Sequence, residues 1–136
     1  MISIDQIKKL RDETGISVGE CKKALEQSQG DMEKARVLLK EWGKRVAEKK
    51  QERQTTEGLV ESYVHSTGKT GVLLEVHCET DFVSRSPEFK TLCHELALQI
   101  VSMGPENVEE LLSQQYIKDS QKDIKGLITE AVAKLG

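Results

Sequence analysis

Two neighbouring histidine–cysteine pairs are the first residues in the sequence whose types could do chemistry. His77 precedes Cys78, and Cys93 precedes His94; such pairs ligate zinc or join a nucleophile to its base. On a strand, His77 and Cys78 point to opposite faces and do not readily hold one ion. On a helix, Cys93 faces the apolar side while His94 turns toward solvent. The spacing therefore argues against a metal site or a thiol enzyme, and favours Cys21, Cys78 and Cys93 as small buried side chains.

Two further polar patterns have the right residue types but the wrong surroundings. Gly68-Lys69-Thr70 resembles the end of a phosphate-binding loop, yet the upstream glycine is absent and no helix is expected to follow. Glu79 and Asp81 could form an acid–base pair, but carboxylates on a turn are usually solvated. We find no catalytic constellation, and we expect a protein that is not an enzyme and uses no cofactor or metal.

The most informative stretch is Glu79-Thr80-Asp81-Phe82-Val83-Ser84-Arg85. An apolar run that predicts a strand (71–76) precedes it, and a predicted helix start (86–89) follows it. Asp81 and Phe82 are therefore predicted on a short strand-to-helix turn, a position where binding residues often lie. A phenylalanine on a polar turn has two explanations: it fills the core beneath the loop, or it is an aromatic contact for a partner protein.

Composition bounds the class of protein. The 136 residues include 32% charged and 4% aromatic side chains, with a net charge of −3. This balance gives no global case for binding nucleic acid or an anionic membrane. No apolar run approaches the roughly 20 residues of a membrane span, and the N-terminus has no signal-peptide pattern. Three cysteines without a CxxC motif indicate reduced thiols, so a cytoplasmic location is expected.

The first third of the chain predicts a three-helix bundle over residues 1–43. Ser17 and Glu20 have capping-box spacing, and Val18 opens what we expect to be the buried stripe of the second helix. The third stripe ends at Trp42, the expected core anchor, and Gly43 is expected to close that helix. Residues 44–56 are then predicted as a solvated linking helix.

The remainder, residues 57–136, predicts an α+β core. The apolar period changes to two, which indicates an antiparallel hairpin over 57–79. Three helices are expected to cover it, at about 87–103, 105–113 and 121–135, with Ser86 as an N-cap and Pro87 at the first helical position. The fold class is therefore α+β: a ubiquitin-associated-like bundle, a linking helix, and a small antiparallel sheet covered by helices.

Three groups of motifs stand out along the chain: first Leu10–Gly15, Cys21–Leu25 and Gly30–Ala35; then Glu57–Val60, Ser62–His65 and Gly68–Leu73; and then Glu79–Arg85. Together they resemble the elongation factor Ts family, the nucleotide-exchange factors of elongation factor Tu. The resemblance covers nearly the whole chain, and Glu79–Arg85 is its most specific motif.

The resemblance implies a partner, the GTPase domain of elongation factor Tu, and a role for each site residue. Phe82 would insert into an apolar gap between helices of that domain, and Asp81 would disturb the network around its magnesium ion. Thr80 and Val83 would hold the turn in shape. Arg11 and Val18 match family positions that make a second contact from the bundle. On the sequence alone, Arg11 can equally be a solvated helix residue and Val18 a core residue.

Departures from the family pattern add further expectations. His77 stands where asparagine is common, and a long helical insertion is absent. The family continues past the final Lys-Leu-Gly into another strand, so we expect a short, single-core form that is C-terminally truncated. Short members pair two copies, which implies a homodimer. The alternative function is a ubiquitin-associated-type protein- or peptide-binding adaptor, which explains residues 1–43 but leaves the motifs in 57–103 unexplained.

Overall fold

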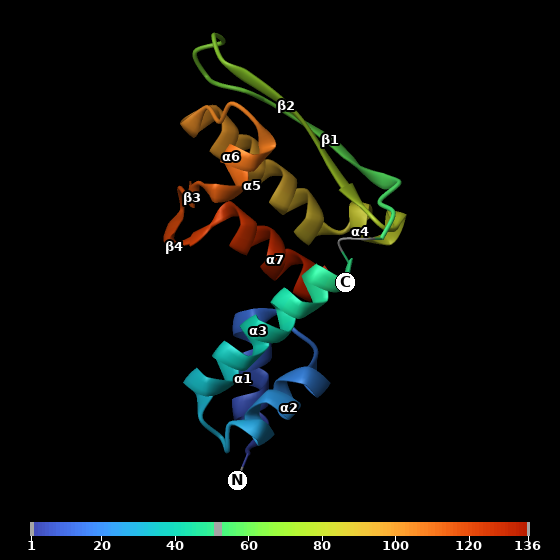
Figure 1. Cartoon of the computed structure of the whole chain (residues 1–136), viewed down its shortest axis with the longest axis vertical. Coiled ribbons are helices and arrows are strands. Elements are labelled where there is room, and N and C mark those ends of the chain that lie inside the picture. Colours follow the sequence, from blue (N-terminus) through green and yellow to red (C-terminus); the bar gives the residue numbers. More distant parts are fainter. Residues whose placement is uncertain (1, 51–52, 136) are drawn as a thin grey trace. The chain divides into compact units, whose positions relative to one another are not determined.

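The computed structural model describes residues 2–50 and 53–135, and it confirms the α+β class. The chain divides into two compact units (Figure 1). Of the described residues, one unit comprises 2–50 with Val132–Lys134, and the other comprises 53–131 with Leu135. Within the described ranges, no helix has the length and apolar character needed to cross a membrane.

The first unit is built from three helices around a small apolar core. They are α1 (Ile4–Thr14), α2 (Val18–Gln27) and α3 (Met32–Lys50). Each start is fixed by a side chain that accepts from a free backbone amide: Ser3 accepts from Gln6, Ser17 from Glu20, and Asp31 from Lys34. The core side chains come from all three helices: Leu10, Cys21, Ala24, Leu25, Ala35 and Leu39.

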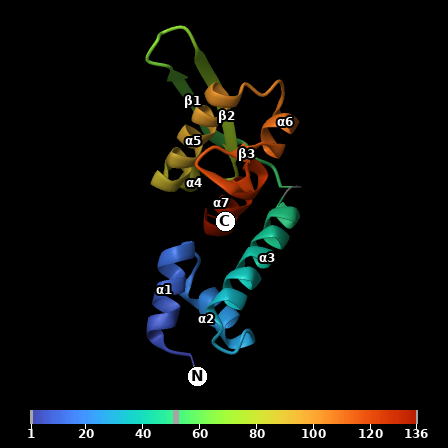
Figure 2. The same cartoon turned by 90° about the vertical axis from the view of Figure 1, so that its left-hand side faces the viewer.

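Two of the expectations for the helices of this unit are wrong. Val18 is 48% exposed and lies outside the stripe formed by Cys21 and Leu25, because the first residue of α2 lies at the edge of its buried face. Gly43 does not end the third helix, which continues to Lys50 (Figure 2). A glycine ends a helix when it adopts the left-handed conformation, as Gly15 does at φ 72°, and Gly43 remains helical.

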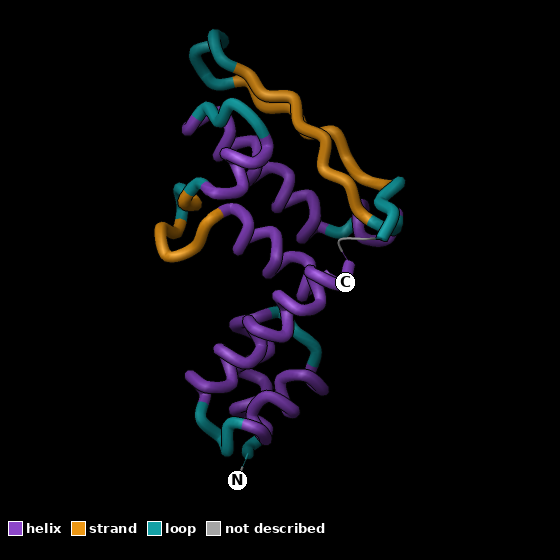
Figure 3. The backbone as a smooth tube through the Cα atoms, in the orientation of Figure 1, coloured by secondary structure: helices purple, strands orange, loops and turns teal. Residues whose placement is uncertain are grey.

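The second unit contains the long hairpin of β1 (Glu57–Val64) and β2 (Gly71–Cys78). The strands pair antiparallel from Glu57 opposite Cys78 to Val64 opposite Gly71. One face of the hairpin packs against α5 (Pro87–Met103), which begins at the N-cap Ser86 and ends at the left-handed Gly104. The loop that joins the strands lies at one end of the hairpin, and α4 (Asp81–Arg85) follows its other end (Figure 3).

The rest of the second unit differs in detail from the expected order of helices. After α6 (Val108–Ser113), a second small hairpin, β3 (Gln115–Tyr116) and β4 (Asp119–Asp123), leads into α7 (Ile124–Leu135). Residues 121–123, expected to be helical, are therefore a strand. The reason is local: the Asp123 carboxylate accepts from the Gly126 amide at 2.7 Å, which starts the helix after Asp123.

Candidate partner-binding site

The side chain of Phe82 is 86% exposed, although it is one of only two phenylalanines in the chain. The other, Phe89, is buried in the core beside Cys78 and Cys93. Burying a phenylalanine is worth about 1.5–3 kcal/mol relative to exposing it, so this exposure carries a cost in the free chain. The structure therefore excludes a core role for Phe82.

The backbone that carries Phe82 is held from several sides. Thr80 is the N-cap of α4, and its hydroxyl accepts from the Val83 amide at 3.3 Å. The buried Ser84 hydroxyl donates to the Asp81 carbonyl at 3.1 Å. The Cys78 thiol donates to the Thr80 carbonyl with a sulfur–oxygen distance of 3.2 Å. The stretch expected to be a plain turn is thus a single-turn helix, because Thr80 supplies the cap that starts it.

Charged residues flank the exposed ring. Arg85 lies 3.3 Å from the Asp81 carboxylate, and Arg53 lies 3.4 Å from the Glu79 carboxylate. Val83 points the other way and packs, half-buried, against the cluster that contains Phe89. The short α4 therefore has an apolar side that anchors it and an exposed side that presents Asp81 and Phe82. This arrangement suits protein binding.

The candidate metal and thiol residues do not form a site in the described part of the chain. Nowhere in residues 2–50 and 53–135 do three or more His, Cys, Asp or Glu side chains gather around a position for an ion. His77 instead lies 3.3 Å from Glu75, and His94 lies 3.7 Å from Glu61. Burial raises the pKa of the Cys93 thiol to about 11, which keeps it protonated and unreactive at neutral pH.

Comparison with known proteins agrees with the motifs. The family model described as elongation factor TS matches residues 79–136, a stretch that begins with Glu79-Thr80-Asp81-Phe82. Elongation factor Ts of Coprothermobacter proteolyticus is 43% identical over 180 residues, which covers 99% of this chain and 91% of that protein. The chain belongs to the elongation factor Ts family. It is therefore a translation elongation factor by family.

Two further relatives show how far the likeness to elongation factor Ts extends. The protein of Rubrobacter xylanophilus is 50% identical over 178 residues, covering 98% of this chain and 91% of the relative. That of Thermotoga maritima is 41% identical over 178 residues, covering 99% and 89%. These alignments are longer than the 136 residues of this chain, so part of each relative has no counterpart here. A match along the whole chain favours this family over an adaptor that shares only the bundle.

In this elongation factor Ts family member, the other two predicted site residues lie in the first unit. Arg11, on α1, is exposed and lies 3.7 Å from the Asp12 carboxylate. Val18, the first residue of α2, is half-exposed. The structure brings Thr80, Asp81, Phe82 and Val83 together at the start of α4 in the second unit, whereas Arg11 and Val18 lie on α1 and α2 of the first unit.

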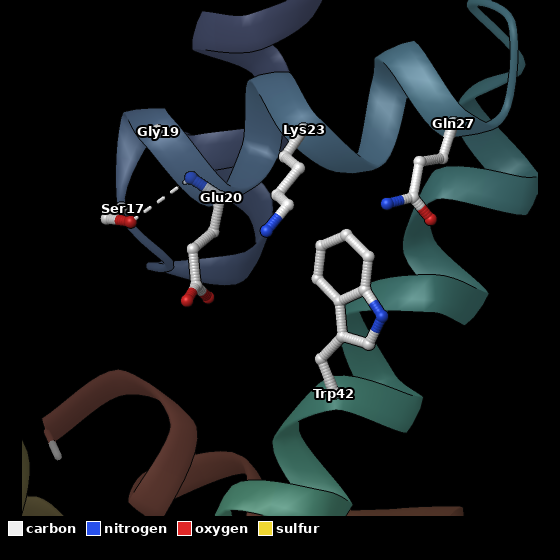
Figure 4. A pocket seen from close by; sticks show the side chains of 6 residues that line it. All are labelled: Ser17, Gly19, Glu20, Lys23, Gln27 and Trp42. Carbon is white, nitrogen blue, oxygen red and sulfur yellow. Dashed lines mark hydrogen bonds between the residues drawn. The ribbon is translucent and has the colours of Figure 1, made fainter.

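A pocket between α2 and α3 was missed in the sequence (Figure 4). It encloses about 440 Å³ and is lined by Ser17, Gly19, Glu20, Lys23, Gln27 and Trp42. Lys23 and Gln27 extend toward the indole ring of Trp42. The pocket explains why Trp42 is only partly buried, rather than the core anchor that its place in the apolar stripe suggested.

The sequence also did not reveal the residues that support the Phe82 turn. Cys78 and Ser84 act through partly buried hydrogen bonds to backbone carbonyls, and Arg85 acts through an ion pair. The only signal was positional. Cys78 ends an alternating strand on its inward face, and Ser84 and Arg85 follow Thr80 and Asp81, respectively, at the helical spacing of four residues.

Proposed function

We propose that this chain is a guanine-nucleotide exchange factor, which binds the GTPase domain of elongation factor Tu and promotes GDP release during translation elongation in the cytoplasm. The observation that carries the proposal is the exposed Phe82 on a backbone fixed by hydrogen bonds. Buried aromatic anchors dominate the energy of many interfaces, and a side chain presented on a fixed backbone costs less to order on binding. The chain itself makes or breaks no covalent bond, so it is not an enzyme.

Exchange requires that the factor bind the nucleotide-free partner more tightly than the GDP-bound partner. By thermodynamic linkage, the factor then weakens GDP binding by the same ratio. Phe82 would enter an apolar gap in the partner, and Asp81 would disturb the contacts around the magnesium ion that GDP needs. Thr80 and Val83 keep the turn in the shape that presents both residues.

A second contact on the same GTPase domain would come from the first unit, through Arg11 and Val18. Both side chains are accessible on its surface. In this proposal residues 1–43 form a binding domain, residues 44–56 link it, and residues 57–136 form the core that carries Phe82. Neither contact involves nucleic acid or membrane.

We also propose that two copies pair through the hairpin face that α5 leaves uncovered. Val60, Val64 and Leu73 are exposed on this face. In the strand register Val60 lies opposite Glu75 and Leu73 lies opposite Ser62, so the three apolar side chains lie close together on one surface. Sedimentation equilibrium tests the pairing: Leu73→Glu should shift a dimer toward the monomer, and a wild-type chain that is monomeric at micromolar concentrations would refute it.

The test of exchange is release of a fluorescent GDP analogue from elongation factor Tu after adding the chain at micromolar concentrations. The wild-type chain should accelerate release, and Phe82→Ala should weaken the effect by about thirtyfold or more, since truncating an aromatic anchor costs at least about 2 kcal/mol. Because Phe82 is exposed, the melting temperature of the Phe82→Ala variant should equal that of the wild type. Val108→Ala, which truncates another exposed apolar side chain, is the matched control and should retain exchange. A folded wild-type chain that leaves GDP release unchanged would refute the proposal.

A further inference from the structure

We propose that Cys78 is a positioning residue for nucleotide exchange, whose buried thiol fixes the backbone that presents Phe82. The inference rests on the proposed exchange function and extends it to a residue that does not touch the partner. Cys78 is the last residue of β2, and its side chain is 8% exposed in the cluster with Phe89 and Cys93. It lies on the inward side of the turn, whereas Phe82 faces solvent.

The thiol contacts the turn at the residue that starts α4. Its sulfur lies 3.2 Å from the Thr80 carbonyl oxygen, well within the range of a sulfur hydrogen bond. The same carbonyl accepts from the Ser84 amide at 3.2 Å, which closes the first turn of the helix. Cys78 therefore ties the strand end to the point where the helix begins.

This tether matters because the ring of Phe82 has little packing of its own. With 86% of the side chain exposed, only the backbone sets the direction in which the ring projects. Two buried side chains, Cys78 and Ser84, hold the carbonyls of Thr80 and Asp81, the two residues before Phe82. A looser turn would have to be ordered on binding, and ordering lowers affinity.

The chemistry of the thiol suits this role. Burial raises the pKa of the Cys78 thiol above its ordinary value of 9.0. Because the net shift is upward, the thiol keeps at neutral pH the proton that it donates. A second buried thiol, Cys93, lies in the same cluster but belongs to α5. Its truncation removes core packing and leaves the bond to Thr80 in place, so it is the matched control.

The experiment compares Cys78→Ala, Cys78→Ser and Cys93→Ala with the wild type. For each variant we would measure the melting temperature, the rate of GDP release at saturation, and the concentration that gives half of this rate. Amide hydrogen exchange of Phe82, Val83 and Ser84 would be followed by NMR on the free chain. The Cys78→Ala variant lacks the donor, and Cys78→Ser restores one of similar size.

We expect Cys78→Ala to raise the half-saturating concentration about threefold to tenfold, as one lost hydrogen bond predicts, with little change in the saturated rate. Its Phe82–Ser84 amides should exchange faster, and Cys78→Ser should restore most of both properties. Cys93→Ala should lower the melting temperature at least as much, yet leave the half-saturating concentration near the wild-type value.

Two results would overturn the inference: equal effects of Cys78→Ala and Cys93→Ala on the half-saturating concentration, or unchanged amide exchange across the turn in Cys78→Ala. A wild-type chain that fails to accelerate GDP release would instead refute the exchange function. In that case the amide exchange alone would decide whether Cys78 fixes the turn, because it is measured on the free chain.

Discussion

The guanidinium of Arg85 lies 3.3 Å from the carboxylate of Asp81, one helical turn away on α4. Their side chains are 80% and 49% exposed, so water screens the pair and it contributes at most about 1 kcal/mol. Asp81 is thus held loosely in the free chain and remains available to a partner.

Replacing Arg85 should therefore have a small effect. We expect Arg85→Gln to change the half-saturating concentration for GDP release by no more than about fivefold, since this factor corresponds to about 1 kcal/mol. Asp81→Asn should cause a clearly larger loss, because in the proposed mechanism it removes the charge that would disturb the magnesium network. Both should melt within a few degrees of the wild type. A loss in Arg85→Gln as large as that in Asp81→Asn would show that the arginine itself binds the partner.

Gln99 fastens the small second hairpin to α5. The side chain is fully buried; its amide nitrogen donates to the Gln115 carbonyl at 3.0 Å, and its oxygen accepts from the Ile117 amide at 2.9 Å. Gln99→Leu leaves both backbone groups without this partner, so unfolding free energy should fall by about 1–3 kcal/mol. Urea unfolding followed by circular dichroism measures the change. The exposed Gln121→Leu is the control, and equal stability of the two variants would contradict the role.

Gly58 allows the two strands of the long hairpin to approach closely. Its φ is 153°, and a Cβ at this position would lie 2.2 Å from the Val76 carbonyl oxygen, which is a steric overlap with the partner strand. Gly58→Ala should lower the unfolding free energy by about 1–3 kcal/mol or more. Gly19→Ala, in α2 with open space around the added methyl group, should be neutral or stabilise by up to about 1 kcal/mol. Thermal melts of both variants and the wild type measure these changes, and equal stability of Gly58→Ala and Gly19→Ala would contradict the role of Gly58.

Alkaline pH should destabilise the fold through two buried groups. Burial, with Glu61 and Cys78 nearby, raises the pKa of Cys93 from 9.0 to about 11. Burial and the hydrogen bond to Glu95 raise the pKa of Tyr116 from 10.0 to about 12. The unfolded chain releases these protons at lower pH than the folded chain does. The stability they confer is therefore complete below about pH 9 and is lost as the pH rises toward 11 and 12.

Urea unfolding at pH 8, 9, 10 and 11 measures this loss. Cys93→Val removes one of the two titrating groups, so its unfolding free energy should fall less steeply with pH than that of the wild type. Val108→Ala, which removes none, should follow the wild-type curve. A Cys93→Val slope equal to the wild-type slope would assign the alkaline loss to other groups.

Local rules were enough to predict the α+β class and several helix starts. Ser17 and Ser86 cap their helices because a hydroxyl at the right spacing reaches a free amide. The rule that a glycine ends a helix failed at Gly43. A glycine marks a helix end only when its backbone adopts the left-handed conformation, and Gly43 does not adopt it. The polar strand β4 gave no alternation of apolar residues to detect, since most of its side chains are exposed.

The candidate site could be predicted only in part. The family motif and the presence of a phenylalanine on a polar turn both pointed to Phe82. The sequence could not show whether its side chain is buried or exposed. That distinction depends on which side of α4 packs against the core. The neighbouring residue Val83 lies on that side, so Phe82 faces solvent. The supports from Cys78 and Ser84 depend on backbone carbonyls, which carry no sequence signature.

The tip of the long hairpin, residues 65–70, is exposed along its whole length and lies at the opposite end of the strands from α4. A backbone bond from the His65 amide to the Thr70 carbonyl closes it at 2.9 Å, so additions inside the loop leave the strand register intact. This loop is therefore the place to install a fluorescent dye or an affinity handle. A probe there would follow the chain through successive rounds of protein synthesis without touching the surface that carries Phe82.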